Sequence, residues 1–538
     1  MKTKVLFITI AFTFLELQNI FSQEWIRIYG DSTNTKVKDV AEQYDKGVLF
    51  SGSKYANAYF ASGWLMKSDI NGYRLWEKLF SIPNKFVKFY GAVRSDDGGV
   101  VEIGVTNKQS STCYDPFIVK TNTCFEKEWC RIFNSSNCDC DGLDIQNTSD
   151  GGYMALIGKW KYGEEQKIWL FRLDSLGEVI WAQVYATDPE WNLEWPYSIE
   201  KTTDNCFVIT GETYYPDPTY PNEKIIKIIL IKVNLNGGTI FEVPWGTDNG
   251  VYSRGYESVE DNQHNIYTAS EHARRSLPVG VSPCIFKTSS TGEPIDCFDL
   301  LTTSVTGIST TINWFQDSSL ILGTKWGYLY GVDTIGVFKS NNMGTVLKSK
   351  SLITSSSGTL QSSDITFNNK VVIAGSFFST NNWQPYAFKL TSDLEYDSVY
   401  TTPFTYDSLC PHPIVSDTIP LDDCEVVVVG IDDPEQHPEK TKLHVYPNPA
   451  SQVITVEMPQ YLIKTSGGSG ITATTYYHQW KSVRLDVFDL FGKLMYSQDI
   501  PGKTEKTELD ISSWPVGMYI ARIVFMNEVT GTVKFVKE

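Results

Sequence analysis

The sequence predicts an all-β protein, in which a seven-bladed β-propeller is followed by a smaller β domain. Three observations support this fold class: a repeat of about 50 residues, β-rich runs that end in Asp/Asn/Gly turns, and no helical hydrophobic period in any repeat. The chain has 538 residues, of which 13% are aromatic and 20% charged. It can therefore bury a large core, and global disorder is excluded.

An apolar-x-apolar-basic tetrapeptide marks each repeat. A turn-forming residue stands two positions after the basic one, and in most repeats a glycine follows three positions later, as in type I turns. The basic residues are Lys67, Lys120, Arg172, Lys232, Lys287, Lys339 and Lys389. The turn-forming residues are Asp69, Asn122, Asp174, Asn234, Ser289, Asn341 and Thr391.

Each repeat reads as four short strands joined by turns. A four-stranded sheet alone leaves both faces exposed, whereas seven sheets packed around an axis cover one another. We therefore predict a seven-bladed propeller over residues 23–400. A parallel β-helix is the alternative, but about 50 residues per coil is too long for it. The segment Glu24–Gly30 resembles an isolated fourth strand, and we expect it to complete the last blade.

The N-terminus has the layout of a secretory signal peptide, which we assign to residues 1–22. Lys2 and Lys4 precede an apolar run from Val5 to Leu15, and the small Ser22 precedes the expected cleavage point. A buried first strand is the alternative. The apolar run is shorter than the about 20 residues that a membrane span needs, and no later run is long enough. We expect no transmembrane segment in the mature chain.

The cysteines fit an exported protein, because disulfides persist in oxidising compartments. We predict the bridges Cys113–Cys130 and Cys284–Cys297, since each pair flanks a hairpin turn symmetrically, and a loop closed by Cys410 and Cys424. The pairing of Cys124, Cys138, Cys140 and Cys206 stays open. A zinc site is the alternative, but the Cys138-x-Cys140 motif lacks a matching partner motif, so we expect no metal and no cofactor.

Residues 401–442 are rich in proline and acidic residues, and we assign them to a linker. Several motifs then follow in a fixed order, and they resemble the type A sorting domain of the type IX secretion system. The motif residues are Tyr446, Pro447, Asn448 and Pro449, then Gly492 and Lys493, then Gly517 and Tyr519, and finally Lys534 and Lys537.

This resemblance implies that residues 443–538 form a small immunoglobulin-like β-sandwich, which the alternating strand pattern also supports. It implies as partners the type IX translocon and its sorting machinery. The protein would then be secreted or attached to the outer cell surface. The propeller repeats resemble the tryptophan- and glycine-marked repeats of exported Bacteroidota proteins. An ordinary adhesive sandwich module is the alternative for the C-terminal domain.

The loops expected on one face of the propeller are rich in aromatic residues, which suit sugar stacking or peptide capture. Packing of these rings under their own loops is the alternative. A compact basic cluster near residue 272 is a second candidate, for a carboxylate or phosphate, although a solvated loop is the favoured explanation. The candidate ligand-binding residues are Glu190, Trp191, Glu194, Trp195, Trp326, Trp383, His272, Arg274 and Arg275.

These observations favour a binding or adhesion protein with a glycan or protein ligand. A propeller enzyme, a polysaccharide lyase or hydrolase, is the main alternative, and a structural surface component is a third. No G-x-S-x-G, H-E-x-x-H or phosphate-loop motif is present. The net charge of -17 argues against nucleic acid as a partner. A convergent Arg, Tyr, His and carboxylate cluster would favour the enzyme, and a broad aromatic shelf would favour binding.

Overall fold

The computed structural model describes residues 24–538 apart from several segments. The predicted signal peptide lies outside the described residues. The other segments left out are 31–32, 58–59, 110–112, 135–138, 161–165, 186–192, 217–223, 247–251, 274–280, 302–305, 316, 328–332, 356, 380, 429–442, 458–481, 490–492, 502–503, 505 and 526–527.

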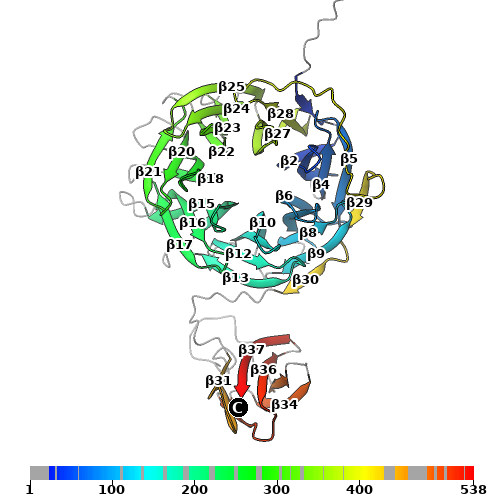
Figure 1. The fold of residues 1–538 in the computed structure, drawn as a ribbon, viewed down its shortest axis with the longest axis vertical. Helices are drawn as coiled ribbons and strands as arrows, with labels where there is room; N and C mark the ends of the chain where they lie inside the picture. The colour runs from blue at the N-terminus through cyan, green and yellow to red at the C-terminus, as the bar shows by residue number, and fades with distance from the viewer. Residues whose placement is uncertain are drawn as a thin grey trace, which may run out of the picture. The chain divides into compact units, whose positions relative to one another are not determined.

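Seven antiparallel sheets surround a central axis in chain order, which confirms the seven-bladed propeller (Figure 1). Each blade has an inner strand next to the axis and three strands further out. The inner strands are β2 (Asn34–Glu42), β6 (Val87–Arg94), β10 (Asp139–Asn147), β14 (Glu194–Lys201), β18 (Tyr252–Glu260), β22 (Thr306–Trp314) and β26 (Gly358–Ile365). The second strands are β3 (Val48–Tyr55), β7 (Val100–Thr106), β11 (Tyr153–Trp160), β15 (Phe207–Pro216), β19 (Ile266–Ala273), β23 (Ser319–Gly327) and β27 (Val371–Ser379).

The third strands contain the repeated tetrapeptide. They are β4 (Ala61–Ser68), β8 (Asp115–Thr121), β12 (Lys167–Leu173), β16 (Lys224–Val233), β20 (Ser282–Thr288), β24 (Asp333–Asn341) and β28 (Asn382–Leu390). The outer strands are β5 (Arg74–Ser81), β9 (Lys127–Asn134), β13 (Val179–Tyr185), β17 (Thr239–Trp245), β21 (Pro294–Asp299), β25 (Val346–Ser355) and, in the last blade, β1 (Ile26–Ile28). Because β1 pairs with β28, the N-terminal strand closes the ring, as expected.

The repeated basic residue is buried in six blades, and in five of these it holds the turn between the first two strands of its blade. Lys67 lies 2.5 Å from Asp45, and Lys232 lies 2.9 Å from Asp204. The same ion pair forms in three more blades, at Lys120–Asp97, Arg172–Asp150 and Lys339–Asp317. A buried cation is costly unless it is paired, so the cation and the acidic turn recur together.

The turn-forming residue caps the next turn as its type predicts. The Asp69 carboxylate accepts hydrogen bonds from the backbone N–H groups of Asn71 (2.9 Å) and Tyr73 (2.7 Å). The equivalent residues of the other six blades accept the same two bonds. The Asx and Ser/Thr pattern therefore reports a real seven-fold repeat of turn geometry.

A β-bulge occurs at the same position of every inner strand. The bulged residues are Lys38, Tyr90, Leu143, Tyr197, Tyr256, Thr310 and Gln361. The residue after the bulge joins neighbouring blades where its side chain is an acid. Asp39 accepts a hydrogen bond from the backbone N–H of Ala92, Asp144 from that of Ile199, and Glu257 from that of Ile312, each at 2.9 Å. Bulges re-aim side chains, and here the carboxylates that follow them contact the neighbouring blade.

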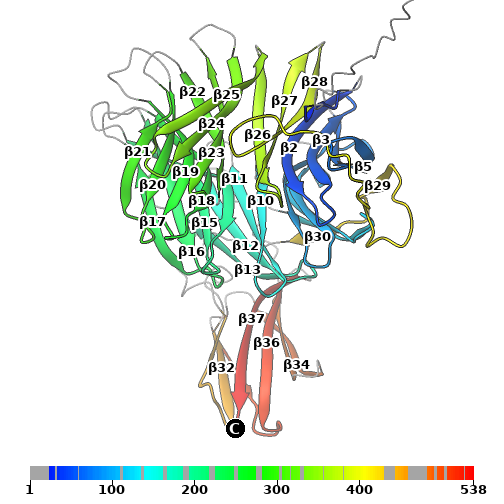
Figure 2. The same ribbon diagram turned by 45° about the horizontal axis from the view of Figure 1, so that its top comes forward.

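Residues 401–428 follow the outer edges of the first two blades, so most of the segment assigned to a linker packs on the propeller (Figure 2). We call this segment the strap. Its strand β29 (Asp417–Pro420) pairs with β5, and its strand β30 (Glu425–Val428) pairs with β9, both in parallel. Ile419 and Leu421 join the hydrophobic core between these blades. The strap thus covers two exposed sheet edges, which are otherwise sites of aggregation.

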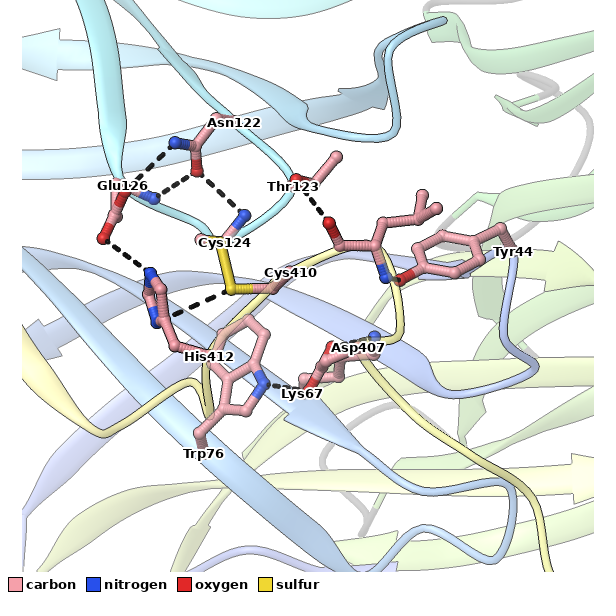
Figure 3. The surroundings of a disulfide bond; sticks show 11 residues. Tyr44, Lys67, Trp76, Asn122, Thr123, Cys124, Glu126, Asp407, Cys410 and His412 are labelled. Carbon is pink, nitrogen blue, oxygen red and sulfur yellow. Dashed lines mark hydrogen bonds and ion pairs between the residues drawn. A yellow bond between two sulfur atoms is a disulfide. The ribbon is translucent and has the colours of Figure 1, made fainter.

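Two disulfides fix the strap, and they correct the predicted pairing. Cys124 is bonded to Cys410 (Figure 3), and Cys130 is bonded to Cys424. The bridges Cys113–Cys130 and Cys410–Cys424 are therefore wrong. In the β8–β9 hairpin Cys130 lies opposite Val119, six residues from Cys113, because the turn is at residues 122–125. The actual bridges join residues 286 and 294 positions apart, which no local symmetry reveals.

The predicted Cys284–Cys297 bridge is also wrong. Cys284 is a buried free thiol, 3.4 Å from the Ser270 hydroxyl. Across the hairpin it lies opposite Asp299, whereas Cys297 lies opposite Phe286. The hairpin is thus offset by two residues from the symmetric register on which the prediction relied.

The described residues between 443 and 538 form a separate unit of two sheets, which confirms the small sandwich. One sheet contains β31 (His444–Tyr446), β32 (Val453–Glu457) and β35 (Lys506–Asp510). The other contains β33 (Ser482–Asp489), β34 (Leu494–Pro501), β36 (Gly517–Phe525) and β37 (Glu528–Lys537). Both sheets contribute to one core, for example through Ile454 and Ile523.

Several of the sorting motifs have structural roles in this unit. The Asn448 side chain donates to the Lys534 carbonyl (3.2 Å) and accepts from the Val536 N–H (2.9 Å), so it ties the first strand to the last. Tyr519 is buried, stacks on Phe535 and donates its hydroxyl proton to a backbone carbonyl. The exposed motif residues are Tyr446, Pro447, Pro449, Lys493 and Lys534. Gly517 begins strand β36, and Lys537 is buried. Gly492 lies outside the described residues.

Candidate ligand-binding site

A cavity of about 460 Å³ opens at the N-terminal ends of the inner strands of blades two, three and four. This is the face on which the sequence predicts the ligand, because the loops between second and third strands and those between blades meet there. The inner strands β6, β10 and β14 and the second strands β7, β11 and β15 supply most of its wall. The lining residues are Phe86, Lys88, Tyr90, Val105, Tyr114, Asp139, Asp141, Trp160, Gln166, Trp195, Tyr197 and Glu212.

Aromatic rings dominate this wall. Trp195 is half-buried, and its ring approaches the backbone of Gly158 on the neighbouring blade so closely that a Cβ there would lie 2.9 Å from it. Phe86 contacts Tyr55 and Tyr114, with ring centroids 6.2 and 5.8 Å apart. The rings come from three different blades, so the shelf exists only in the closed propeller.

Polar groups flank the aromatic wall on the side of blades four and five. Arg254 of β18 is ion-paired with Glu212 and lies 3.7 Å from Glu271. The hydroxyl of Tyr214 donates to Glu212 (2.9 Å), and that of Tyr256 donates to Glu271 (2.8 Å). Burial raises the pKa of Glu271 to about 7, although the Tyr256 hydrogen bond and Arg254 oppose the shift.

Three lysines lie on the other side, on the first two blades. Lys36 and Lys38 come from β2, and Lys88 comes from β6. Burial lowers the pKa of all three, to about 8 for Lys38 and Lys88. Mutual repulsion adds to the shift, because Lys36 lowers the pKa of Lys38, and both lower that of Lys88. Asp141 opposes it at Lys38 and Lys88.

The structure brings two of the predicted ligand residues to this region. Trp195 lines the cavity, and the Trp383 ring lies 4.1 Å from the Lys36 ammonium group. Trp326 instead packs against Phe338 inside blade six, with ring centroids 5.0 Å apart. Its position favours the alternative of packing under its own loop. Glu190, Trp191, Arg274 and Arg275 lie outside the described residues.

Two other predicted residues are buried, which corrects their expected roles. Glu194 has only 2% of its surface exposed, and it is not among the residues that line the cavity. His272 is 1% exposed, packs near Trp245 and lies 3.4 Å from Asp299 within blade five. It belongs to β19, which pairs with β18 and β20, and not to a loop as the sequence suggested.

Sequence reasoning missed the lysine trio and the Arg254 cluster. Each of these residues stands alone in its strand, with no motif around it. An alignment of the inner strands could have located this region. In four blades the bulged position of the inner strand holds a lysine or a tyrosine, namely Lys38, Tyr90, Tyr197 and Tyr256.

The only candidate metal group in the described part of the chain consists of Cys124, Cys410 and His412. Both sulfurs are already bonded in a disulfide, and the His412 ring lies 3.7 Å from the Cys410 sulfur. A disulfide sulfur is not a thiolate ligand, so this group does not fit a metal.

The blades and this open cavity define the chain as a β-propeller protein with a cavity at one end of its channel. Residues 444–538 match the family described as secretion system C-terminal sorting domain. The chain is therefore exported by type IX secretion to the cell surface or the extracellular space, and the secretion machinery is its partner on that route. Among the described residues, no helix is long and apolar enough to cross a membrane.

Solved structures with propeller folds resemble the chain at low identity. An ulvan lyase of polysaccharide lyase family 25 is 7% identical over 68% of this chain and 96% of its own, with a TM-score of 0.45. The propeller domain of the trilobed protease of Pyrococcus furiosus is 11% identical over 69% and 100%, with a TM-score of 0.40. A Dyadobacter fermentans protein of unknown function is 9% identical over 67% and 96%, with a TM-score of 0.40. These likenesses concern the fold alone. No curated protein matches the chain.

Proposed function

We propose that the propeller binds a glycan in the cavity between blades two and four. The aromatic wall is the observation that carries this proposal. Pyranose rings have apolar C–H faces that stack on flat aromatic side chains, while their hydroxyls need polar partners at the edges of the same site. The cavity supplies both, because Trp160, Trp195 and Tyr114 line it together with Asp139 and Gln166.

A peptide ligand would use the site less well. Extended peptides bind through the hydrogen-bonding groups of an exposed strand edge. The cavity is lined by side chains of inner and second strands that are already paired within their sheets. The outer edges of blades one and two, where a peptide strand would add, carry the strap.

The test is binding of the secreted full-length protein to an array of oligosaccharides, with isothermal titration of the best ligand. We expect Trp195→Ala to weaken binding about 5- to 150-fold, the loss typical of an aromatic hot spot of roughly 1–3 kcal/mol. The matched control is Trp181→Ala, which removes a half-buried tryptophan from the outer strand β13. Equal affinity of the wild type and Trp195→Ala would count against the site.

A second candidate function is glycan cleavage, which the Arg254 cluster favours. It places two carboxylates, Glu212 and Glu271, around one arginine, beside the cavity that Glu212 lines. A carboxyl group with a pKa near 7 is present in both its protonated and its ionised form at neutral pH, and the protonated form can act as a general acid. Release of reducing ends by the wild type but not by Glu271→Gln would support this activity. Binding without any release would leave the binding function alone.

A further inference from the structure

We propose that the glycan is anionic, and that the lysines Lys36, Lys38 and Lys88 bind its carboxylate or sulfate groups. This inference rests on the proposed glycan-binding function and names the class of glycan. It is carried by the juxtaposition of three ammonium groups with the aromatic cavity, which Lys88 itself lines.

The three lysines differ from most of the repeated basic residues of the propeller. Five of those seven residues form ion pairs with acids in the turns, as at Lys67 and Lys232. By contrast, none of Lys36, Lys38 and Lys88 forms an ion pair with a carboxylate in the part of the chain that the structure describes. Lys38 donates a hydrogen bond to the Gln361 amide oxygen at 3.1 Å. Their remaining contacts are aromatic, with Lys36 over Trp383 and Lys88 over Phe86, both at 4.1 Å from the ring centroid.

Such an arrangement is costly unless an anion is bound. Three ammonium groups that repel one another and are partly removed from water lose hydration, and Asp141 offsets this loss only at Lys38 and Lys88. The chain as a whole carries a net charge of -17 and has 63 acidic residues available. Unmatched cations at the mouth of the channel are therefore a local exception, and a ligand that brings its own negative charge would remove the cost.

The acids in the neighbourhood define how the ligand lies. Asp139 in the cavity wall accepts a hydrogen bond from the Tyr114 N–H at 2.9 Å. Burial raises the pKa of Asp141 to about 6, although Lys88 and Lys38 oppose the shift. An anionic chain would lie across the mouth of the channel, with its rings on the aromatic wall.

A phosphate or an acidic peptide would also satisfy the lysines, but the neighbouring rings favour a sugar. Trp383 is in contact with Lys36, and Phe86 and Tyr90 are in contact with Lys88 and Lys38. A uronate or a sulfated sugar has its anionic group directly attached to the ring that would stack. One sugar residue can therefore stack on an aromatic ring while its anionic group contacts the neighbouring lysine.

The experiment compares three oligosaccharide probes by titration with the full-length secreted protein. The probes are oligogalacturonate (carboxylate), a carrageenan oligosaccharide (sulfate) and a neutral β-glucan oligosaccharide of equal length. Lys38→Met and Lys88→Met remove the charge but keep the side-chain length. The matched control is Lys201→Met, an exposed lysine at the other end of β14. Polyglutamate serves as the acidic peptide probe.

We expect at least one anionic probe to bind about 10-fold or more tightly than the neutral one, with an affinity that falls as salt is added. Each of Lys38→Met and Lys88→Met should weaken that probe roughly 10-fold, whereas Lys201→Met leaves it unchanged. The better anionic probe distinguishes carboxylate from sulfate recognition.

Two results would overturn the inference. In the first the proposed glycan-binding function still holds, and in the second it fails as well. If the neutral probe binds as tightly and only Trp195→Ala weakens it, the site binds glycans without selecting charge. If polyglutamate binds through the lysines and no oligosaccharide binds, the ligand is an acidic peptide and the glycan-binding function fails as well.

Discussion

Glycines in the turns before the outer strands are required for two separate reasons. Gly177 has a φ of 78°, a region that side chains with a Cβ avoid. A Cβ at this position would also lie 2.8 Å from the Trp129 ring of the preceding blade. The same contact joins Trp181 to Gly237 and Phe241 to Gly292. The repeated aromatic residue and the repeated glycine are thus two halves of one contact between blades.

Gly177→Ala should therefore be more destabilising than Gly151→Ala. Both glycines have positive φ, but no atom lies within 4 Å of a Cβ built at Gly151. We expect a loss of about 1–2 kcal/mol for Gly151→Ala from backbone strain alone, and roughly 1–3 kcal/mol more for Gly177→Ala from overlap with the indole. Denaturant titration of the two variants measures both. Equal losses would show that the contact with Trp129 contributes nothing.

Side-chain ionisation in the channel makes stability depend on pH. Burial raises the pKa of Asp144 to about 7 and that of Glu200 to about 8, with repulsion from the other channel acids adding to the shift. A carboxyl group whose pKa is raised by folding contributes stability below its unfolded pKa, and this contribution is lost as pH rises through the folded value. The window therefore runs from about pH 4 to about pH 8.

The melting temperature of the propeller should accordingly fall between pH 5 and pH 8. Asp144→Asn should make this decline shallower, because it removes one titrating group and keeps an amide oxygen that accepts the hydrogen bond from Ile199. Asp96→Asn, at an exposed aspartate, serves as the control and should leave the slope unchanged. A melting temperature that rises over this range would mean that these acids are ionised in the folded protein.

The strap is the element whose structure the sequence conceals most. Its prolines and acids are typical of a linker, yet its side chains form specific contacts (Figure 3). Asp407 is 2.5 Å from Lys67 and accepts a hydrogen bond from the Trp76 indole at 2.9 Å. The two disulfides close loops of 286 and 294 residues. They restrict the unfolded chain, for which long loops give an expected stabilisation of about 2–5 kcal/mol per bridge.

Non-reducing peptide mapping of the secreted protein should recover the peptides joined through Cys124–Cys410 and Cys130–Cys424. In the variant Cys124→Ser/Cys130→Ser, the strap should become accessible to limited proteolysis within residues 401–428, and the protein should lose several kcal/mol of stability. Cys284→Ser is the control, because this buried thiol is unbridged. Resistance of the strap to proteolysis in the double variant would show that β29 and β30 hold it without the disulfides.

The blades were predictable from sequence because each repeats the same local chemistry. The basic residue, the Asx turn and the glycine are separated by fixed intervals, so their signal accumulates over the chain. The candidate site was predictable only in part. Trp195 was found as a loop tryptophan, but Lys38, Lys88 and Arg254 come from different blades and meet only when the ring closes. The predicted disulfide pairing was wrong for the same reason. Both actual bridges connect the strap to blade two, and almost the whole propeller sequence lies between the bonded cysteines.

For the whole molecule, export and folding should be separable. The propeller with its strap ends at residue 428 among the described residues, and the sorting unit forms a core of its own. Deletion of residues 443–538 should therefore leave a folded propeller that accumulates in the periplasm, because the signal for the type IX translocon is lost. Cell fractionation and protease protection measure this. Surface display equal to that of the full-length protein would contradict the assigned role of the C-terminal domain.

The central claim is that this exported propeller binds a glycan in the cavity between blades two and four. The most direct test is hydrogen–deuterium exchange of the full-length protein with and without the oligosaccharide that binds most tightly. With the oligosaccharide bound, we expect slower exchange of backbone amides at residues 87–90, 139–141 and 195–197. Exchange in the strap and in blade six should change little. Protection confined to the outer edges of the blades or to the sorting domain, with none around Trp195, would contradict it.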